Sequence, residues 1–287
     1  MKTFSKQPDE TMLFNVDCAL CGGRDFLLKW KNSDIPFVRC RNCGLVFQNP
    51  MPSAEELALR YDGEYYDYEI ENEESFYRLM ILGLEDLGFF DREACIFSRC
   101  KNEGRRPSFV DVGCATGKLL STMKDRGWDV NGAEVCRPAA QYGIEKRGVD
   151  IHIGPLESAG IPDATVDVLH CSHLIEHLTR PDLFVAEVAR ILRPGGLFIV
   201  VTPDISGFQA RLFGSEWRSA IADHMYLFSK ETLSAMFAAN GFKIIKKASW
   251  GGLAAGTSPK WLKIIADRVV KPLGAGDVIS IMGMISL

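Results

Sequence analysis

The stretch Phe109–Leu120, FVDVGCATGKLL, determines how the rest of the chain is interpreted. An apolar run ends in Asp111, a turn of small residues lies between Gly113 and Gly117, and a helical pattern begins at Lys118. This order predicts a strand, a tight glycine loop and a helix N-terminus. Glycines let the backbone approach a ligand closely, and the first amides of a helix favour a polar or anionic group.

The spacing of the glycines narrows the choice of ligand. The loop reads G-x-x-x-G and lacks the G-x-G-x-x-G spacing of a dinucleotide pyrophosphate turn. The next strand-like segment, DVNGAEV, carries Glu134 near its end, where a carboxylate can accept both hydroxyl groups of a ribose. Together the two features predict an adenosine ligand that carries no pyrophosphate.

Two later segments complete a family pattern: VDVLHCSHLIEHL at residues 166–178 and LRPGGLFIVVTP at residues 192–203. With DVGCATG and GAEV before them, they stand in the order of the class I S-adenosylmethionine-dependent methyltransferases, which the chain resembles from about residue 108 onward. The resemblance implies an enzyme that uses S-adenosylmethionine. It also implies an α/β fold with a doubly wound, mostly parallel, Rossmann-like sheet of seven strands, the last of them antiparallel.

Four of the nine cysteines form two Cys-x2-Cys pairs near the N-terminus. Cys18 and Cys21 are separated by 18 residues from Cys40 and Cys43, which is the spacing of a four-thiolate zinc site. A glycine beside the second cysteine of each pair permits a tight turn toward the metal. We therefore predict a zinc ribbon whose zinc is structural, because four thiolates leave no open coordination position. The alternative is four buried free cysteines in a small β unit.

The chain divides into three predicted parts: a zinc ribbon at 1–50, a helical connector that caps the substrate pocket at 51–107, and the methyltransferase domain at 108–287. In the connector, Ser53 and Glu56 form a capping box that predicts a helix through about Tyr61. A second helical pattern covers residues 74–100.

The ends of the predicted parallel strands should meet at one edge of the sheet and surround the ligand. By resemblance, the glycine loop holds the methionine portion of S-adenosylmethionine, Glu134 the ribose, and the loop after the third strand the adenine. The fourth strand end faces the methyl group. The residues expected to contact the cofactor are Asp111, Gly113, Ala115, Gly117, Glu134, Val135, Leu156, Glu157, Cys171 and Ser172.

His224 is the main catalytic candidate. Methyl transfer from a sulfonium depends on positioning, and a weakly acidic acceptor also needs a base, for which histidine is suited. The segment around His224, SEWRSAIADHMYLFSKETL, resembles the substrate-side insertion of the family. We predict that His224 acts as a base or orients the acceptor. The alternative is that it binds a backbone group and fixes the loop.

His177 is the second catalytic candidate, and it lies in a group of polar residues just past the fourth strand. His173, Glu176 and His177 are spaced so that they share one helical face. A similar family branch, the ubiquinone-biosynthesis O-methyltransferases, has Glu-x-x-Glu-His here and uses it for a divalent cation, whereas this chain has His173 in place of the first Glu. Metal binding and helix-orienting hydrogen bonds both stay open.

Bulk properties restrict the function further. The chain has 287 residues, a formal net charge of −4 and no Lys/Arg-rich run, so nucleic acid is not expected as a partner. No apolar stretch reaches the roughly 20 residues that span a bilayer, and the N-terminus lacks the apolar core of a signal peptide, so we expect a cytoplasmic protein without membrane contact. The sequence leaves the oligomeric state open.

The predicted activity is methyl transfer to an oxygen or carbon of a small molecule, such as a sugar, a polysaccharide precursor or a secondary metabolite. One alternative is an NAD-dependent oxidoreductase on the same sheet, against which the missing G-x-G-x-x-G counts. The other is a zinc-ribbon interaction protein with an inactive methyltransferase domain, against which the intact Asp111, Gly113, Gly117 and Glu134 count.

Overall fold

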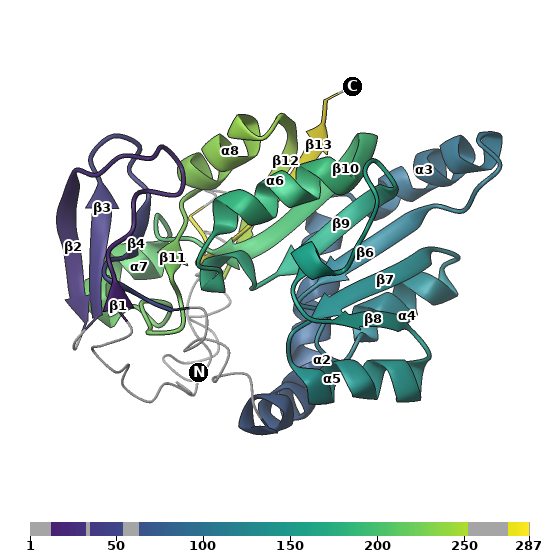
Figure 1. Cartoon of the computed structure of the whole chain (residues 1–287), viewed down its shortest axis with the longest axis horizontal. Helices are drawn as coiled ribbons and strands as arrows, with labels where there is room; N and C mark the ends of the chain where they lie inside the picture. Colours follow the sequence, from purple (N-terminus) through teal and green to yellow (C-terminus); the bar gives the residue numbers. More distant parts are fainter. Residues whose placement is uncertain (1–12, 33–34, 54–62, 252–274, 287) are drawn as a thin grey trace, which may run out of the picture.

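A seven-stranded sheet forms the centre of the computed structural model, which describes residues 13–32, 35–53, 63–251 and 275–286 (Figure 1). Its strands, in the spatial order β12-β13-β10-β9-β6-β7-β8, are β6 (Ser108–Val112), β7 (Asp129–Glu134), β8 (Asp150–Ile153), β9 (Val166–Ser172), β10 (Leu192–Pro203), β12 (Phe242–Trp250) and β13 (Val278–Ile285). β13 pairs antiparallel with β10 and β12, whereas β10, β9, β6, β7 and β8 pair in parallel. The doubly wound sheet with an antiparallel last strand is therefore confirmed.

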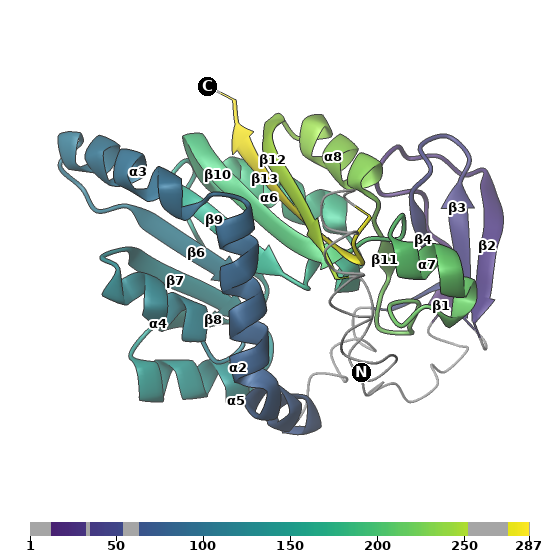
Figure 2. The ribbon, with the colours of Figure 1, turned by 180° about the vertical axis from the view of Figure 1, so that it is seen from behind.

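The sheet has a hydrophobic core on each face, because successive side chains of a strand point to opposite sides. On one face Val110 and Leu169 belong to a core that includes α6 (Pro181–Ile191) and α8 (Lys230–Ala239). On the other face Phe109 and Val168 belong to a second core. The helices that contribute to this second core are α2 (Gly63–Asp86), α3 (Phe90–Asn102), α4 (Lys118–Asp125) and α5 (Arg137–Tyr142). Figures 1 and 2 show the two helical layers from opposite sides.

The helical pattern predicted at residues 74–100 is divided between α2 and α3. The break lies at Gly88, whose φ of +66° is the left-handed conformation that commonly ends a helix and that glycine adopts most easily. In the view of Figure 2 the two helices lie in front of the sheet. The predicted helix from the capping box of Ser53 and Glu56 falls mostly outside the described residues. Within the described part of the chain, no helix is both long and apolar enough to cross a membrane.

The cysteine module forms a second sheet of four strands. Three of them belong to the module: β2 (Phe26–Asn32), β3 (Ile35–Cys40) and β4 (Val46–Gln48). The fourth is β11 (Tyr226–Leu227), which comes from the segment between β10 and α8 and pairs antiparallel with β4. A small ladder of β1 (Leu13–Phe14) and β5 (Met51–Pro52) flanks it. The N-terminal module is thus joined to the main domain by a shared sheet (Figure 1).

Short helical turns connect the remaining elements. They are η2 (Gly143–Arg147, a π-helical turn), η3 (Leu156–Ser158), η4 (Ile175–His177), α7 (Phe208–Phe213) and η5 (Gly214–Glu216). Three of them follow strands at the carboxyl edge of the sheet: η3 follows β8, η4 follows β9, and α7 follows β10. That edge is where an open parallel sheet binds its ligands.

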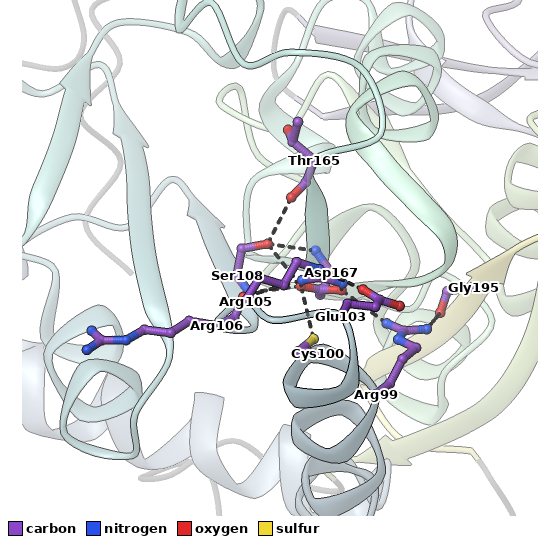
Figure 3. Close-up of polar contacts among 9 residues, drawn as sticks. All are labelled: Arg99, Cys100, Glu103, Arg105, Arg106, Ser108, Thr165, Asp167 and Gly195. Carbon is purple, nitrogen blue, oxygen red and sulfur yellow. Dashed lines mark hydrogen bonds and ion pairs between the residues drawn. The ribbon is translucent and has the colours of Figure 1, made fainter.

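At the opposite, amino edge, Asp167 at the start of β9 is fully buried within a cluster of polar groups (Figure 3). Arg105 donates to both of its carboxylate oxygens, Arg99 donates to one, and the amide of Ser108 donates to the other. Arg99 belongs to α3, and Ser108 begins β6. The cluster therefore attaches α3 to the middle of the sheet.

Candidate functional site

The glycine loop after β6 takes the backbone conformation that its sequence predicts. Gly113 and Gly117 both have φ of +70°, and Ala115 between them has φ of +46°. A Cβ added at Gly117 would lie 2.9 Å from Cγ2 of Val149, so a side chain there would clash. The amide of Gly113 donates to the carbonyl of Ala133 on β7, 2.8 Å away. The loop is thus a close turn that leads directly into α4.

Glu134 lies at the end of β7 and contacts this loop. Its Oε2 accepts a hydrogen bond from the amide of Ala115 at 2.9 Å, and its Oε1 accepts one from the amide of Cys136 at 2.8 Å. The side chain is buried, and burial raises the pKa of its carboxyl group. Each carboxylate oxygen has a further lone pair. Glu134 therefore shapes the loop, a role that the sequence analysis missed, and its predicted contact with a ribose stays a prediction.

The other predicted cofactor residues line the edge in different ways. Val135 is 48% exposed directly after Glu134, whereas Leu156 on η3 is buried and Glu157 beside it is exposed. Cys171 is fully buried in the core on the α6 face, and burial raises the pKa of its thiol. Ser172 at the end of β9 is half-buried.

Asp111 is buried inside the sheet. It is the register partner of His170 on the neighbouring β9, and its Oδ1 lies 2.7 Å from Nδ1 of that histidine. The contact links β6 and β9 just below the glycine loop. His170 occupies a core position of the sheet.

Helix α2 supports the glycine loop from the side, which no sequence motif indicated. Glu73 accepts hydrogen bonds from the hydroxyl of Thr116 in the loop and from Arg147, the latter at 2.8 Å. Its neighbour Glu74 accepts one from Lys118, the first residue of α4, at 2.5 Å. Carboxylates from the connector thus fix both the loop and the helix start. Only the pairing of charges across more than 40 residues could have revealed these contacts.

Past the end of β9, Glu176 is a buried carboxylate with two hydrogen-bond partners. Its Oε1 lies 3.1 Å from Nδ1 of His173, and its Oε2 accepts from the hydroxyl of Thr202 at 2.9 Å. Burial alone would raise its pKa, but the hydrogen bond and the charge of His173, with His177 and His224 nearby, lower the pKa of Glu176 to about 2. The group therefore stays ionised at neutral pH.

His177 and His224 lie against each other although 46 residues separate them in the chain. Nδ1 of His177 is 2.7 Å from the carbonyl of Asp223, and Nδ1 of His224 is 2.8 Å from the carbonyl of Ser219. A carbonyl can only accept, so both Nδ1 atoms donate and both Nε2 atoms carry lone pairs. The ring centroids are 4.7 Å apart with an edge-to-face orientation.

His224 shares one feature with the other fully buried histidine, His170. It is fully buried, yet its Nε2 has no hydrogen-bond partner among the residues that the structure describes. Burial, followed by the charge of His177, lowers the pKa of His224 to about 3, so the ring is neutral at pH 7. Ligand atoms of Glu176, His177 and His224 all lie within 4.8 Å of one another. His224 also makes the loop-fixing backbone contact that the sequence left open as an alternative.

The four N-terminal cysteines converge as their spacing predicts. Sγ of Cys18 lies 3.4 Å from Sγ of Cys43, Sγ of Cys21 lies 3.5 Å from Sγ of Cys40, and all four sulfurs lie within 4.8 Å of one another. Zinc–sulfur bonds of about 2.3 Å in a tetrahedron place sulfurs about 3.8 Å apart, so the cluster fits one zinc ion. The N–H groups of Gly22 and Gly44 close two similar turns onto the carbonyls of Cys18 and Cys40.

The sheet, the glycine loop and the acidic residue at the next strand end define the α/β class of protein that binds an adenosine-containing ligand at its carboxyl edge. A family model described as a methyltransferase domain matches residues 90–247, more than half of the chain. The protein therefore belongs to the methyltransferase domain family. The match begins at α3, so the cysteine module lies outside it.

Curated relatives match parts of the chain. A protein of Mycolicibacterium smegmatis named "Probable S-adenosylmethionine-dependent methyltransferase" is 34% identical over 125 residues, covering 42% of this chain and 47% of the relative. A ubiquinone biosynthesis O-methyltransferase of Brucella ovis is 27% identical over 180 residues, covering 56% of this chain and 71% of the relative. The chain thus spans about half the length of the first of these proteins.

Among solved structures, a SAM-dependent methyltransferase of Thermotoga maritima superposes with a TM-score of 0.54 and 21% identity, over 77% of this chain and 97% of that one. A complex between the Haloferax volcanii Trm112 methyltransferase activator and a methyltransferase contributes a chain with a TM-score of 0.50 and 19% identity, over 72% of this chain and 95% of that one. At these identities the likeness shows the fold alone.

Proposed function

We propose that this protein transfers a methyl group from S-adenosylmethionine to an oxygen or carbon of a small molecule. The observation that carries the proposal is that one sheet edge holds a glycine loop tied to Glu134 and, past the adjacent strand β9, the pair His177 and His224. Family membership and relatives named as S-adenosylmethionine-dependent methyltransferases support it. Sugars, polysaccharide precursors and secondary metabolites are the acceptor classes we favour, as the sequence analysis did.

On the side of the methyl donor, the conformation of the glycine loop fits S-adenosylmethionine. Gly113 and Gly117 adopt left-handed φ values that form the close turn after β6, and Val135 exposes an apolar side chain beside Glu134. The cofactor, when bound, supplies the sulfonium methyl group. We propose that Gly113, Ala115 and Gly117 pack against its methionine portion, and that Glu134 uses its free lone pairs for the ribose. Asp111 is proposed to act from below, by fixing β6 to β9 through His170.

On the acceptor side, we propose that His224 and His177 orient the acceptor and take up its proton. Both rings are held by a backbone carbonyl at Nδ1, which leaves Nε2 as the basic atom. Glu176 stays ionised beside them and stabilises any positive charge that a proton brings. Because His224 is fully buried, the half-buried His177 is the nearer of the two to an incoming acceptor.

One observation favours a second role for the same cluster. Nε2 of His224 is buried without a partner in the described structure, and one ligand atom each of Glu176, His177 and His224 lie within 4.8 Å of one another. Two imidazoles and a carboxylate form a donor set that suits a divalent transition-metal ion. Carbonyl groups at both Nδ1 atoms are the outer contacts that metal-bound histidines usually make. A cation there would hold the acceptor oxygen in place of a direct contact with histidine.

We further propose that Cys18, Cys21, Cys40 and Cys43 hold one structural zinc ion. The converging sulfurs and the two similar glycine turns support this assignment. Purified protein should contain about one zinc per chain, and replacing Cys40 and Cys43 by Ser should release it. Stoichiometric zinc in the double variant would place the metal elsewhere, with Glu176, His177 and His224 as the next candidates. The cytoplasmic location and the absence of a nucleic-acid partner stay predictions.

Calorimetric titration with S-adenosylmethionine and with NAD tests the main proposal. We expect binding of the sulfonium cofactor and none of the dinucleotide, because the glycine loop lacks the dinucleotide spacing. Binding of NAD alone would support the oxidoreductase alternative, and binding of neither would support the interaction protein. Incubation of a metabolite extract with isotopically labelled S-adenosylmethionine, followed by mass spectrometry, should then identify the acceptor.

A further inference from the structure

The cysteine module reaches the candidate active site through its last strand. β4 pairs with β11 so that Phe47 lies opposite Tyr226 and Val46 lies opposite Leu227. The amide of Gln48, the last residue of β4, donates to the carbonyl of Met225 at 2.8 Å. The segment that carries His224 therefore contributes a strand, β11, to the sheet of the cysteine module.

The side chain of Gln48 extends this contact to the turn that precedes β11. Its amide nitrogen donates to the carbonyl of Ala222 at 2.9 Å and to that of His224 at 2.8 Å, and it lies 3.3 Å from the carbonyl of Ile221. Gln48 is 3% exposed, so water has little access to replace its side chain as the donor to these carbonyls. A single side-chain amide thus satisfies the backbone on both sides of the turn at Asp223.

That turn sets the positions of both candidate histidines. The carbonyl of Asp223 accepts the hydrogen bond from His177, and the carbonyl of His224 accepts the one from Gln48. Gln48 therefore binds the carbonyl of His224 itself, and it binds the carbonyls on either side of the one that holds His177. Among the described residues, the side-chain hydrogen bonds of Gln48 go to residues 221, 222 and 224, so its effect should be confined to the acceptor side.

The packing of the cysteine module holds the strand that carries Gln48 in place. Cys18 and Cys40 are buried in the same hydrophobic core as Phe47 and Tyr226. The rings of Phe47 and Tyr226 stack with centroids 5.8 Å apart, and the hydroxyl of Tyr226 donates to the carbonyl of Thr179, two residues beyond His177. Cys18, Cys40 and β4 thus pack against the segment that follows His224.

We propose that Gln48 is a positioning residue for methyl transfer, which holds the turn at residues 222–224 and thereby sets His177 and His224 against each other. The inference rests on the proposed function. It assigns the cysteine module a place in the acceptor half of the active site, in addition to any structural role of its metal.

The test replaces Gln48 by Met, which keeps the volume and removes the donor. Gln141, exposed on α5, is replaced by Met as the matched control. The first measurement needs no acceptor: long-range nitrogen-15 NMR of the imidazole rings, with His177→Ala and His224→Ala to assign the signals among the five histidines. In the unchanged protein both rings should be in the Nδ1–H form, since both donate to carbonyls. In Q48M, His177 and His224 should become mixtures of the two neutral forms, and in Q141M they should not change.

The second measurement uses the acceptor identified with labelled donor. Q48M should lower kcat by about 10-fold to 100-fold, the scale on which misplaced catalytic groups affect rates. The Kd of S-adenosylmethionine should change less than about twofold. Gln48→His retains an N–H donor at this position and should recover part of the loss, and it also serves if Q48M does not fold.

The inference would be overturned if His177 and His224 kept their Nδ1–H forms in both Q48M and Gln48→His. So would a loss of donor affinity as large as the loss of rate, because that would show a general loosening of the domain. Failure of the protein to bind S-adenosylmethionine at all would contradict the proposed function instead, while the ring forms would still report whether Gln48 positions the histidines.

Discussion

The two ends of β9 treat buried polar groups in opposite ways. At its start, Asp167 has two arginines and a backbone amide around its carboxylate (Figure 3). Just past its end, the ring of His224 is as deeply buried, yet its Nε2 has no partner in the described structure. Nε of Arg99 in the first cluster also lacks a partner, so an unpaired buried atom does not by itself mark a functional site. From the contrast between the two side chains we propose that the amino edge of this sheet serves stability and the carboxyl edge serves chemistry.

The largest effect should come from His224→Ala, which tests the functional end. We expect methyl transfer to slow by about 100-fold to 10,000-fold, the range for loss of a general acid or base, while the Kd of S-adenosylmethionine changes little. Steady-state rates and calorimetry would measure both. Wild-type activity in the variant would remove His224 from the mechanism.

The same variant separates the two roles proposed for the cluster. If Glu176, His177 and His224 hold a divalent cation, treatment of the unchanged protein with a chelator should lower the rate to that of His224→Ala, and added metal should restore it. If they act without a metal, the chelator should leave the rate unchanged at full zinc occupancy of the cysteines, which metal analysis would verify.

Asp167→Ala tests the stabilising end. The substitution leaves Arg105 and Arg99 without their buried partner, so the free energy of unfolding should fall by about 3 to 5 kcal/mol. Asp163→Ala is the control, because its ion pair with Arg190 is exposed and should contribute no more than about 1 kcal/mol. Urea unfolding measures both variants. Equal losses, or a weaker Kd for S-adenosylmethionine in folded Asp167→Ala, would contradict the division between the two edges.

Glu134 combines a structural and a proposed functional role, because it fixes the glycine loop and is proposed to bind the cofactor. Glu134→Ala should weaken S-adenosylmethionine binding by about 1.5 to 3 kcal/mol, the scale of hydrogen bonds to a charged group. Glu134→Gln should lose part of that, since its amide nitrogen cannot accept from Ala115 or Cys136 as a carboxylate oxygen does. Calorimetry at matched stability measures the difference. An unchanged Kd in the folded Ala variant would exclude Glu134 from the cofactor site.

The conformation of the glycine loop could be predicted from the sequence because its signals are local. The glycines at 113 and 117 lie four residues apart, and Glu134 ends the adjacent strand, so the pattern of the chain already places them together. The four cysteines could be predicted for the same reason, since each pair closes within one turn. Physical spacing rules apply directly where a site is built from neighbouring residues.

The acceptor side and the cluster at Asp167 could not be predicted in this way. Gln48 meets the carbonyls of Ile221, Ala222 and His224 across more than 170 residues, and β11 has only two residues, too few for a periodic pattern. Arg105 reaches Asp167 across 62 residues. The histidines could be identified as candidates by their chemistry, but the contacts of their Nδ1 atoms depend on how distant segments pack.

The smallest effect, and the last test of the comparison, is the pH dependence of stability. Burial would raise the pKa of Asp167, but its hydrogen bonds from Arg105 and Ser108 outweigh burial and hold the pKa below its usual value. A carboxyl group whose pKa is lower in the folded than in the unfolded chain stabilises the fold above about pH 4, and this contribution is lost as the pH falls through the folded pKa. The difference in unfolding free energy between the unchanged protein and Asp167→Asn should therefore be constant from pH 7 to pH 5. It should shrink below about pH 4, by at most about 1.4 kcal/mol per pH unit, because one proton is involved. A gap at Asp167 that stays constant down to pH 3 would show that its charge is not what stabilises the amino edge.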